Sequence, residues 1–167
     1  MKCLRFENFF KTISFCVMFL IVCMTGCSTI QYNAKLYDNA TEWIKEDFIK
    51  SNLTSGAFYD DMQTDESYPS DRTMIIKSNE EKLSCFNSEF DVEVNFEKEM
   101  FIVYTWTTVY HRDCWLKRLE VIDDVLYIKY SLAPVAIGVG DASRPFQRWV
   151  IIKLGLLPIT SVQVEEI

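Results

Sequence analysis

The sequence is poor in the residues that build catalytic and metal sites. It contains a single histidine, His111, in a chain of 167 residues. One histidine falls short of the ligand set of most catalytic zinc sites. No serine stands in a Gly-x-Ser-x-Gly setting, so the sequence does not indicate the nucleophile of an α/β-hydrolase. The sequence therefore names no enzyme class, and we expect no enzymatic activity.

Glycine is also scarce, with five residues in the whole chain. Its densest occurrence, Gly138-Val-Gly140-Asp141-Ala-Ser143, lacks the third glycine of a dinucleotide-binding loop and the Lys-Ser/Thr ending of a phosphate-binding loop. Arg144 and Pro145 follow it, where a nucleotide-binding loop would continue into a helix. This pattern excludes a nucleotide-binding loop, and we expect no cofactor.

The chain has no long hydrophobic run. The longest unbroken apolar stretch, residues 15–24, has 10 residues. As a helix it would be about 15 Å long, against a hydrocarbon core of about 30 Å. It is too short to span a membrane, but its length suits the core of a signal peptide, and the basic residues Lys2, Arg5 and Lys11 precede it.

The apolar run ends in Met24-Thr25-Gly26-Cys27. This segment resembles the type II signal peptide of bacterial lipoprotein precursors, although Met24 stands where leucine is usual. The resemblance implies that a diacylglyceryl group is attached to the Cys27 thiol and that the chain is cut between Gly26 and Cys27. The alternative is an ordinary secretory signal or an uncleaved anchor, in which Cys27 has no role. The first interpretation predicts a protein on the extracytoplasmic face of the cell membrane.

These features divide the chain into a signal peptide (residues 1–26), a flexible tether (27–39) and one extracytoplasmic domain (40–167). Removing residues 1–26 takes three of the 17 basic and one of the 24 acidic residues, which leaves 14 against 23 and a net charge of −9. Phosphate backbones and anionic headgroups repel such a chain. We therefore expect no nucleic-acid partner, and membrane contact only through the lipid.

Two cysteines, Cys85 and Cys114, remain in the predicted domain. An exported domain with an even number of cysteines is able to form a disulfide bond. A bond between these two would close a loop of roughly 30 residues and add about 3 kcal/mol of stability. The alternative is two separate thiols, partly buried as small apolar side chains.

The predicted fold class is α+β, mostly β. One amphipathic helix over residues 40–51 presents Trp43, Ile44 and Phe48 on one face. Alternation and β-branched or aromatic residues predict strands at 73–77, 90–96, 100–110, 115–122, 125–132, 147–154 and 159–165. We expect the helix to pack on a small antiparallel sandwich or partly open barrel of six or seven strands.

The strands leave few candidates for chemistry. His111 could act as a base for a Cys114 nucleophile, or the two could form a metal site together with Asp113, but a loop spacing of three residues does not show that these groups converge. The alternative is a polar turn. Arg144 and Arg148 could form a small anion-binding patch, because guanidinium groups match carboxylates in geometry. The alternative is that each pairs internally, for example with Asp141.

The block at residues 138–149, with Tyr104-Thr-Trp-Thr and Tyr110-His-Arg, is similar to small exported lipoproteins of Gram-positive bacteria, which are uncharacterised as a group. More distantly, it resembles the β-rich C-terminal module of a protease-stabilising subunit. The resemblance covers residues 90–167. It implies a small β module and assigns no functional residue.

We therefore expect a lipid-anchored extracytoplasmic domain with a binding or structural role. Its partner would be another envelope protein or a peptide, added at an exposed strand edge. Two alternatives remain open at this point. One is a small envelope hydrolase or metal-dependent enzyme that uses His111 and Cys114, and the other is a solute-capture lipoprotein.

Overall fold

The stretch that is richest in aromatic and β-branched residues forms the central strand of the structure. The computed structural model describes residues 33–134 and 144–167. Strand β5 (Glu99–Thr108) is buried over seven consecutive residues, so both of its faces are covered, as the sequence predicts. It pairs along its whole length with β8 (Phe146–Gly155) and on its other side with β4 (Asp71–Ile76).

A short strand, β1 (Lys35–Tyr37), completes this first sheet by pairing with β8. The strand order is β1-β8-β5-β4, and all pairs are antiparallel. The strand β1 lies inside the segment 27–39 that we predicted as a flexible tether. That prediction is wrong for residues 35–37, because their main chain is bound to the sheet. Residues 27–32 lie outside the described residues.

A second sheet contains β6 (Cys114–Ile122), β7 (Val125–Leu132) and β9 (Ser161–Glu166), in the order β6-β7-β9. The predicted hairpin between β6 and β7 is confirmed. Asp123 and Asp124, its two turn residues, have φ values of 49° and 62°. Two consecutive positive φ angles are typical of the type I′ turn, which matches the twist of a hairpin. β9 pairs with β7 in parallel, which departs from the antiparallel arrangement elsewhere.

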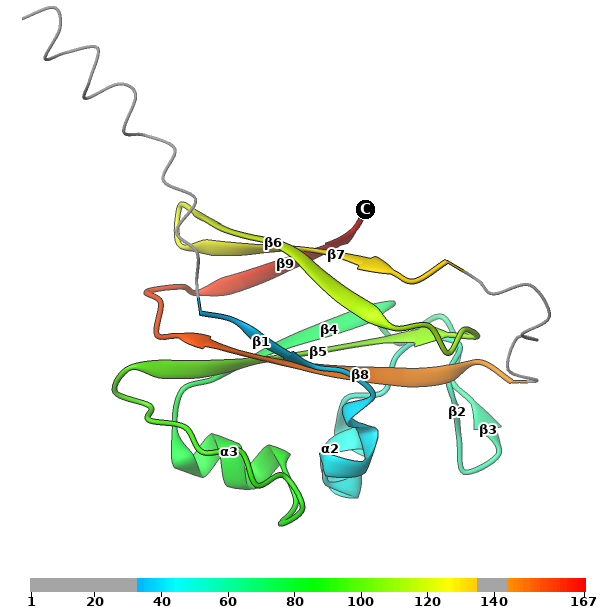
Figure 1. Cartoon of the computed structure of the whole chain (residues 1–167). Helices are drawn as coiled ribbons and strands as arrows, with labels where there is room; N and C mark the ends of the chain where they lie inside the picture. Colours follow the sequence, from blue (N-terminus) through cyan, green and yellow to red (C-terminus); the bar gives the residue numbers. More distant parts are fainter. Residues whose placement is uncertain (1–32, 135–143) are drawn as a thin grey trace, which may run out of the picture. The chain divides into compact units, whose positions relative to one another are not determined.

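The two sheets and the helices form three layers, with the first sheet in the middle (Figure 1). Successive side chains of β5 alternate between its two faces. Met100 and Ile102 face the second sheet, where they join Leu126 and Ile128 in one core cluster. Phe101 and Val103, on the opposite face of β5, belong to a separate core beneath the helices. The described strands are therefore a mostly antiparallel sandwich that does not close into a barrel.

The predicted helix at 40–51 is not continuous. The structure has a 3₁₀ helix, η2 (Ala40–Trp43), and a separate α-helix, α2 (Glu46–Ser51). Ile44 and Lys45 between them are extended, and Ile44 forms a β-bridge with Phe86. This contact with a distant segment buries Ile44 and breaks the helix, so the prediction of one amphipathic helix is wrong.

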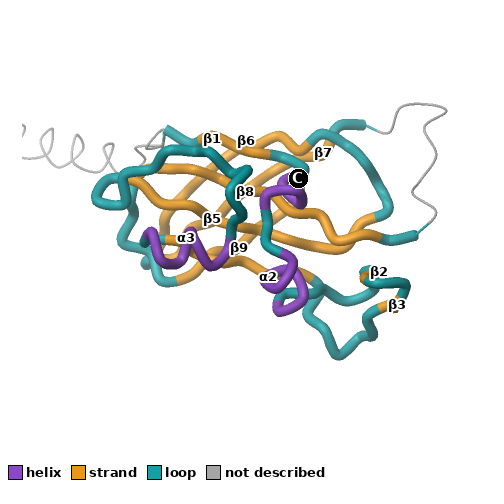
Figure 2. Tube along the Cα trace, turned by 90° about the horizontal axis from the view of Figure 1, so that it is seen from below, coloured by secondary structure: helices purple, strands orange, loops and turns teal. Residues whose placement is uncertain are grey.

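A second α-helix, α3 (Asn79–Cys85), lies on the same side of the first sheet as α2, as Figure 2 shows from below. The hydroxyl of Ser78 caps it by accepting a hydrogen bond from the Glu81 amide at 3.2 Å. No helix within the described residues is both long enough and apolar enough to cross a membrane. The acidic segment before β4 contains a small hairpin, β2 (Phe58–Tyr59) and β3 (Met62–Gln63).

Residues 90–96 are only partly as predicted. Their side chains do alternate, with Phe90 buried, Val92 and Val94 half-buried, and Asp91 and Glu93 exposed. No strand pairs with them among the described residues, however. The apolar side chains pack against the core beneath the helices, but the segment crosses this layer instead of joining a sheet. The predicted orientation of the side chains is confirmed, whereas the predicted strand is not formed among the described residues.

Candidate functional site

A buried ion pair lies between the two sheets. Arg148 stands on β8 in the same alternation as Val150 and Ile152, so its side chain enters the space between the sheets, and its residue is only 1% exposed. Asp38 is the residue that follows β1. Because β1 and β8 are neighbours in the first sheet, Asp38 lies close enough to reach Arg148.

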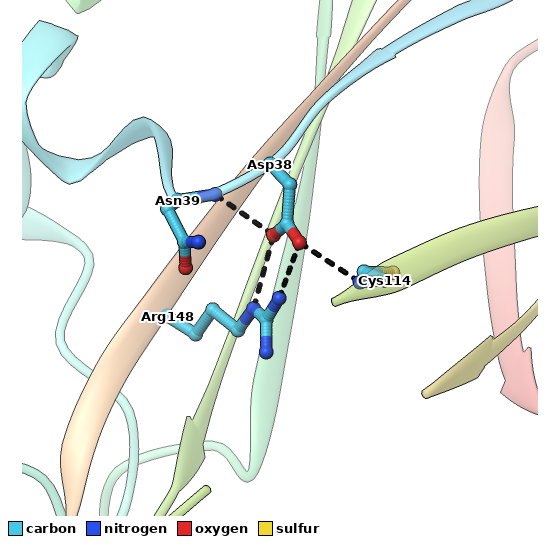
Figure 3. Close-up of polar contacts among 4 residues, drawn as sticks. All are labelled: Asp38, Asn39, Cys114 and Arg148. Carbon is cyan, nitrogen blue, oxygen red and sulfur yellow. Dashed lines mark hydrogen bonds and ion pairs between the residues drawn. The ribbon is translucent and has the colours of Figure 1, made fainter. Parts of the chain in front are cut away.

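The Asp38 carboxylate makes four hydrogen bonds (Figure 3). Arg148 donates from Nε to Oδ1 at 3.1 Å and from Nη2 to Oδ2 at 2.5 Å. The main-chain amide of Cys114 donates to Oδ2 at 2.8 Å, and that of Asn39 donates to Oδ1 at 2.8 Å. Since Cys114 begins β6, this one carboxylate joins β1 and β8 of the first sheet to the second sheet.

The surroundings of the pair are aromatic. The guanidinium carbon of Arg148 lies 5.4 Å from the centre of the Trp106 ring, and Tyr104, Tyr130 and Cys114 share the same buried cluster. Charges in such an environment are poorly solvated, so each depends strongly on the other. The Nη1 atom of Arg148 is buried and has no hydrogen-bond partner among the described residues. The geometry is that of a structural junction that holds the sheets together.

The same environment controls the Cys114 thiol. Burial, and secondarily the charge of Asp38, raise its pKa to about 12. Thiolate is the nucleophilic form of cysteine, so this thiol is protonated and unreactive near neutral pH. Burial likewise raises the pKa of Tyr130 to about 12. These groups are inert parts of the interior.

His111 does not join Cys114. The histidine is exposed, and its ring stacks on that of Phe146, with 4.2 Å between centroids and 12° between planes. No hydrogen bond connects its side chain to Cys114 or Asp113 in the part of the chain that the structure describes. Within the same residues, no three histidine, cysteine or acidic side chains are grouped to hold a metal ion. The arrangement gives no support to the base-and-nucleophile hypothesis.

Of the two alternatives for the cysteines, the structure has the separate buried thiols and not the disulfide bond. Cys85 and Cys114 are both free and buried. Cys85 lies at the end of α3 in the core beneath the helices, whereas Cys114 lies between the sheets. The first sheet separates them. Burial raises the pKa of Cys85 to about 12 as well.

The structure does not bring Arg144 and Arg148 together as an anion patch, because each arginine has its own acidic partner. Arg144 Nη1 lies 2.5 Å from Oδ1 of Asp61, and this pair is exposed to solvent. Arg148 is occupied by Asp38 in the interior. The alternative of internal pairing is the one observed, with partners other than Asp141. Asp141 lies outside the described residues.

The residue that the sequence analysis missed is Asp38. It lies 110 residues from Arg148 in the sequence, and no local pattern connects the two. Its only signal is an acidic residue at the end of a short apolar-polar alternation, which is too common to be diagnostic. The proposed lipid-bearing residue, Cys27, lies outside the described residues.

Together these features define a small two-layer β-sandwich with an outer layer of short helices. A scan against known protein families, a search of curated proteins and a search of solved structures each found no match to the chain.

Proposed function

We propose that this protein is a lipid-anchored extracytoplasmic lipoprotein whose β-rich domain has a binding or structural role at the cell envelope. The observation that carries the proposal is the sequence Met24-Thr25-Gly26-Cys27 at the end of a short apolar run. A diacylglyceryl group adds two chains at about 0.8 kcal/mol per buried CH₂, which is enough for stable anchoring.

The binding role is supported by main chain that is available for pairing. β6 lies at one edge of the second sheet, with Trp115 and Ile122 each 47% exposed along it. An exposed edge is a template for another strand, and aromatic side chains are enriched in protein interfaces. The partner class that fits is another envelope protein or a peptide from one.

The mass of the full chain extracted from membranes of its native host tests the anchor. We expect the loss of residues 1–26 and the gain of acyl mass. Replacing the proposed attachment residue, Cys27→Ala, should abolish both changes. The matched control is Cys23→Ala, which removes a thiol four residues earlier and should leave both intact. Unmodified full-length polypeptide in the cytosol would contradict the proposal.

A further inference from the structure

The extended segment 91–95 has the form of a strand without a neighbour. Its polar side chains point outward and its valines point toward the core, as in a half-buried strand. Among the residues that the structure describes, no acceptor binds the main-chain N–H groups of Val92, Glu93 or Val94. The segment therefore presents three successive free donors, and such donors are strong hydrogen-bonding groups.

Two carbonyl oxygens of this segment, those of Val92 and Glu93, are bound by lysine side chains. Lys82 Nζ donates to the oxygen of Val92 at 2.7 Å, and Lys153 Nζ donates to that of Glu93 at 2.7 Å. In a sheet, the N–H groups of an adjacent strand occupy these positions. The ammonium groups of two lysines thus occupy the positions that the N–H groups of an adjacent strand would take.

An open surface groove lies beside the segment. A cavity of about 490 Å³ is lined by residues of α3, of the segment itself and of the β5 and β8 ends, namely Asn79, Lys82, Glu93, Val94, Asn95, Glu99 and Lys153. This volume falls within the roughly 300–1,000 Å³ range of ligand sites. In extended chain, the N–H and C=O of alternate residues point to the same side. Val92 and Val94 therefore share one side, and Lys82 shows that this side faces α3.

The cavity is lined by two lysines and two glutamates, so its formal charges balance, and the pairing of the lysines decides what it can bind. Lys153 is already paired with Glu99 at 3.0 Å. Lys82 has no carboxylate partner in the part of the chain that the structure describes, and its ammonium group is held by a carbonyl oxygen instead. A peptide N–H that took over the Val92 oxygen would release this ammonium group to bind a carboxylate, which is the stronger, charge-assisted contact.

We propose that residues 91–95 accept an extended peptide of a partner protein as an added β-strand on the side of α3, with a carboxylate of that peptide bound to Lys82. This inference rests on the proposed binding role and gives it a site other than the β6 edge. The β6 edge fits an added strand less well. Its register is interrupted between Leu116 and Arg118, and Lys117 lies at the interruption. Bulges and lysines are the usual means by which proteins block edge pairing.

The test uses the full-length protein in detergent micelles, labelled with ¹⁵N, and the probe acetyl-Thr-Val-Thr-Asp-Thr-Val-Thr-amide. Binding should slow the hydrogen exchange of the Val92 and Val94 amides by roughly tenfold at saturation, and that of Glu93 much less, because only the first two face the peptide. The same peptide with N-methylated main-chain amides should produce no protection. The probe with asparagine in place of its aspartate should bind more weakly.

Matched protein variants locate the contact. Val94→Pro removes a donor on the side of α3 and should abolish binding, whereas Glu93→Pro removes the neighbouring donor on the opposite side and should preserve it. Lys82→Met should remove the preference for the aspartate probe over the asparagine probe. These comparisons remain informative if Val94→Pro fails to fold, because the N-methylated peptide tests the same strand pairing from the other side: it lacks the peptide N–H groups that would donate to the Val92 oxygen of the unaltered protein.

Three outcomes would overturn the inference. One is unchanged exchange at Val92 and Val94 in millimolar probe, and another is equal protection by the N-methylated peptide. The third is protection in the free protein that grows with protein concentration, which would assign the groove to a second copy of the chain. None of these outcomes affects the acyl mass on Cys27. Binding without that mass would instead refute the anchor and retain the site.

Discussion

Cys85 and Cys114 lie on opposite faces of the first sheet, each in a separate buried cluster. Neither thiol reaches the other without disruption of β5 and β8, so oxidation would have to unfold the domain first. The exported location that we propose therefore coexists with two reduced cysteines.

The first prediction concerns these thiols. In native protein at pH 8, Cys85 and Cys114 should react very slowly with a water-soluble thiol reagent, because burial raises both pKa values to about 12. At that pKa only about one thiol in 10⁴ is ionised at pH 8. In denaturant both should react rapidly. A mass 2 Da lower without reductant than with it would contradict the prediction, since it would show a disulfide bond.

The second prediction is a loss of stability in alkali. Burial raises the folded-state pKa of each thiol above that of an exposed thiol, so the unfolded chain releases protons first as the pH rises. The free energy of unfolding should therefore fall between pH 9 and pH 12. The slope should approach about 1.4 kcal/mol per pH unit for each thiol. Urea unfolding at several pH values measures it.

The control for this pH dependence is the double variant C85A/C114A. It should be less stable at neutral pH because two buried side chains are truncated, but its stability should fall less steeply in alkali. Equal slopes for the variant and the natural sequence would show that the thiols do not contribute.

The third prediction concerns the Asp38–Arg148 pair. Asp38→Asn leaves the buried guanidinium without its counter-charge and should destabilise the domain by about 3–5 kcal/mol. The matched control is Asp61→Asn, which breaks the exposed pair with Arg144 and should cost less than about 1 kcal/mol. Urea denaturation compares the two. Adding Arg148→Met to Asp38→Asn should recover part of the loss, and a purely additive double variant would argue against coupling.

The fourth prediction uses the alternation of residues 90–96. Phe90→Ala should cost about 3–5 kcal/mol, because Phe90 contacts the rings of Phe86, Phe101 and Tyr37 in the core. Asp91→Ala, one position away on the exposed side, should change stability by no more than about 0.5 kcal/mol. Thermal unfolding measures both variants. Similar effects would mean that the segment is not anchored through one face.

A fifth prediction concerns the turn between β6 and β7. Asp124 has a φ of 62°, a left-handed conformation that glycine adopts without steric cost. Asp124→Gly should therefore raise the free energy of unfolding by about 0.5 kcal/mol, as an Asp-Gly pair is preferred in type I′ turns. The same change at Asp113, whose φ is not positive, should give no such gain. A lower melting temperature for Asp124→Gly would contradict the assignment of a type I′ turn at this position.

Features that depend on neighbouring residues were predictable from the sequence. The run of aromatic and β-branched residues around Phe101 identified the central strand, because burial on both faces needs no polar alternation. Asp123 and Asp124 between two strand-like segments identified the hairpin. The alternation from Phe90 to Phe96 gave the correct buried face, since that face depends only on the period of the extended chain.

Features that depend on contacts between distant segments were not predictable. The bridge between Ile44 and Phe86 breaks a helix that local periodicity favours. The missing partner of segment 90–96 is a property of the whole topology, and extended conformation alone does not reveal it. The ion pair of Asp38 with Arg148 joins residues that are far apart in the sequence, and Arg148 is therefore not available for an anion patch. The pairing of β1 with β8 likewise fixes residues that we predicted as part of a flexible tether.

If Cys27 carries the proposed lipid, the position of β1 limits how far the domain can stand from the membrane. The strand begins at Lys35, eight residues after Cys27. A polypeptide extends by at most about 3.5 Å per residue, so the linker between Cys27 and Lys35 is no longer than about 28 Å. With the acyl chains on Cys27 inserted in the bilayer, the domain would lie close to the lipid headgroups. In the proposed lipoprotein, a ligand of the domain would therefore have to come within this distance of the membrane surface.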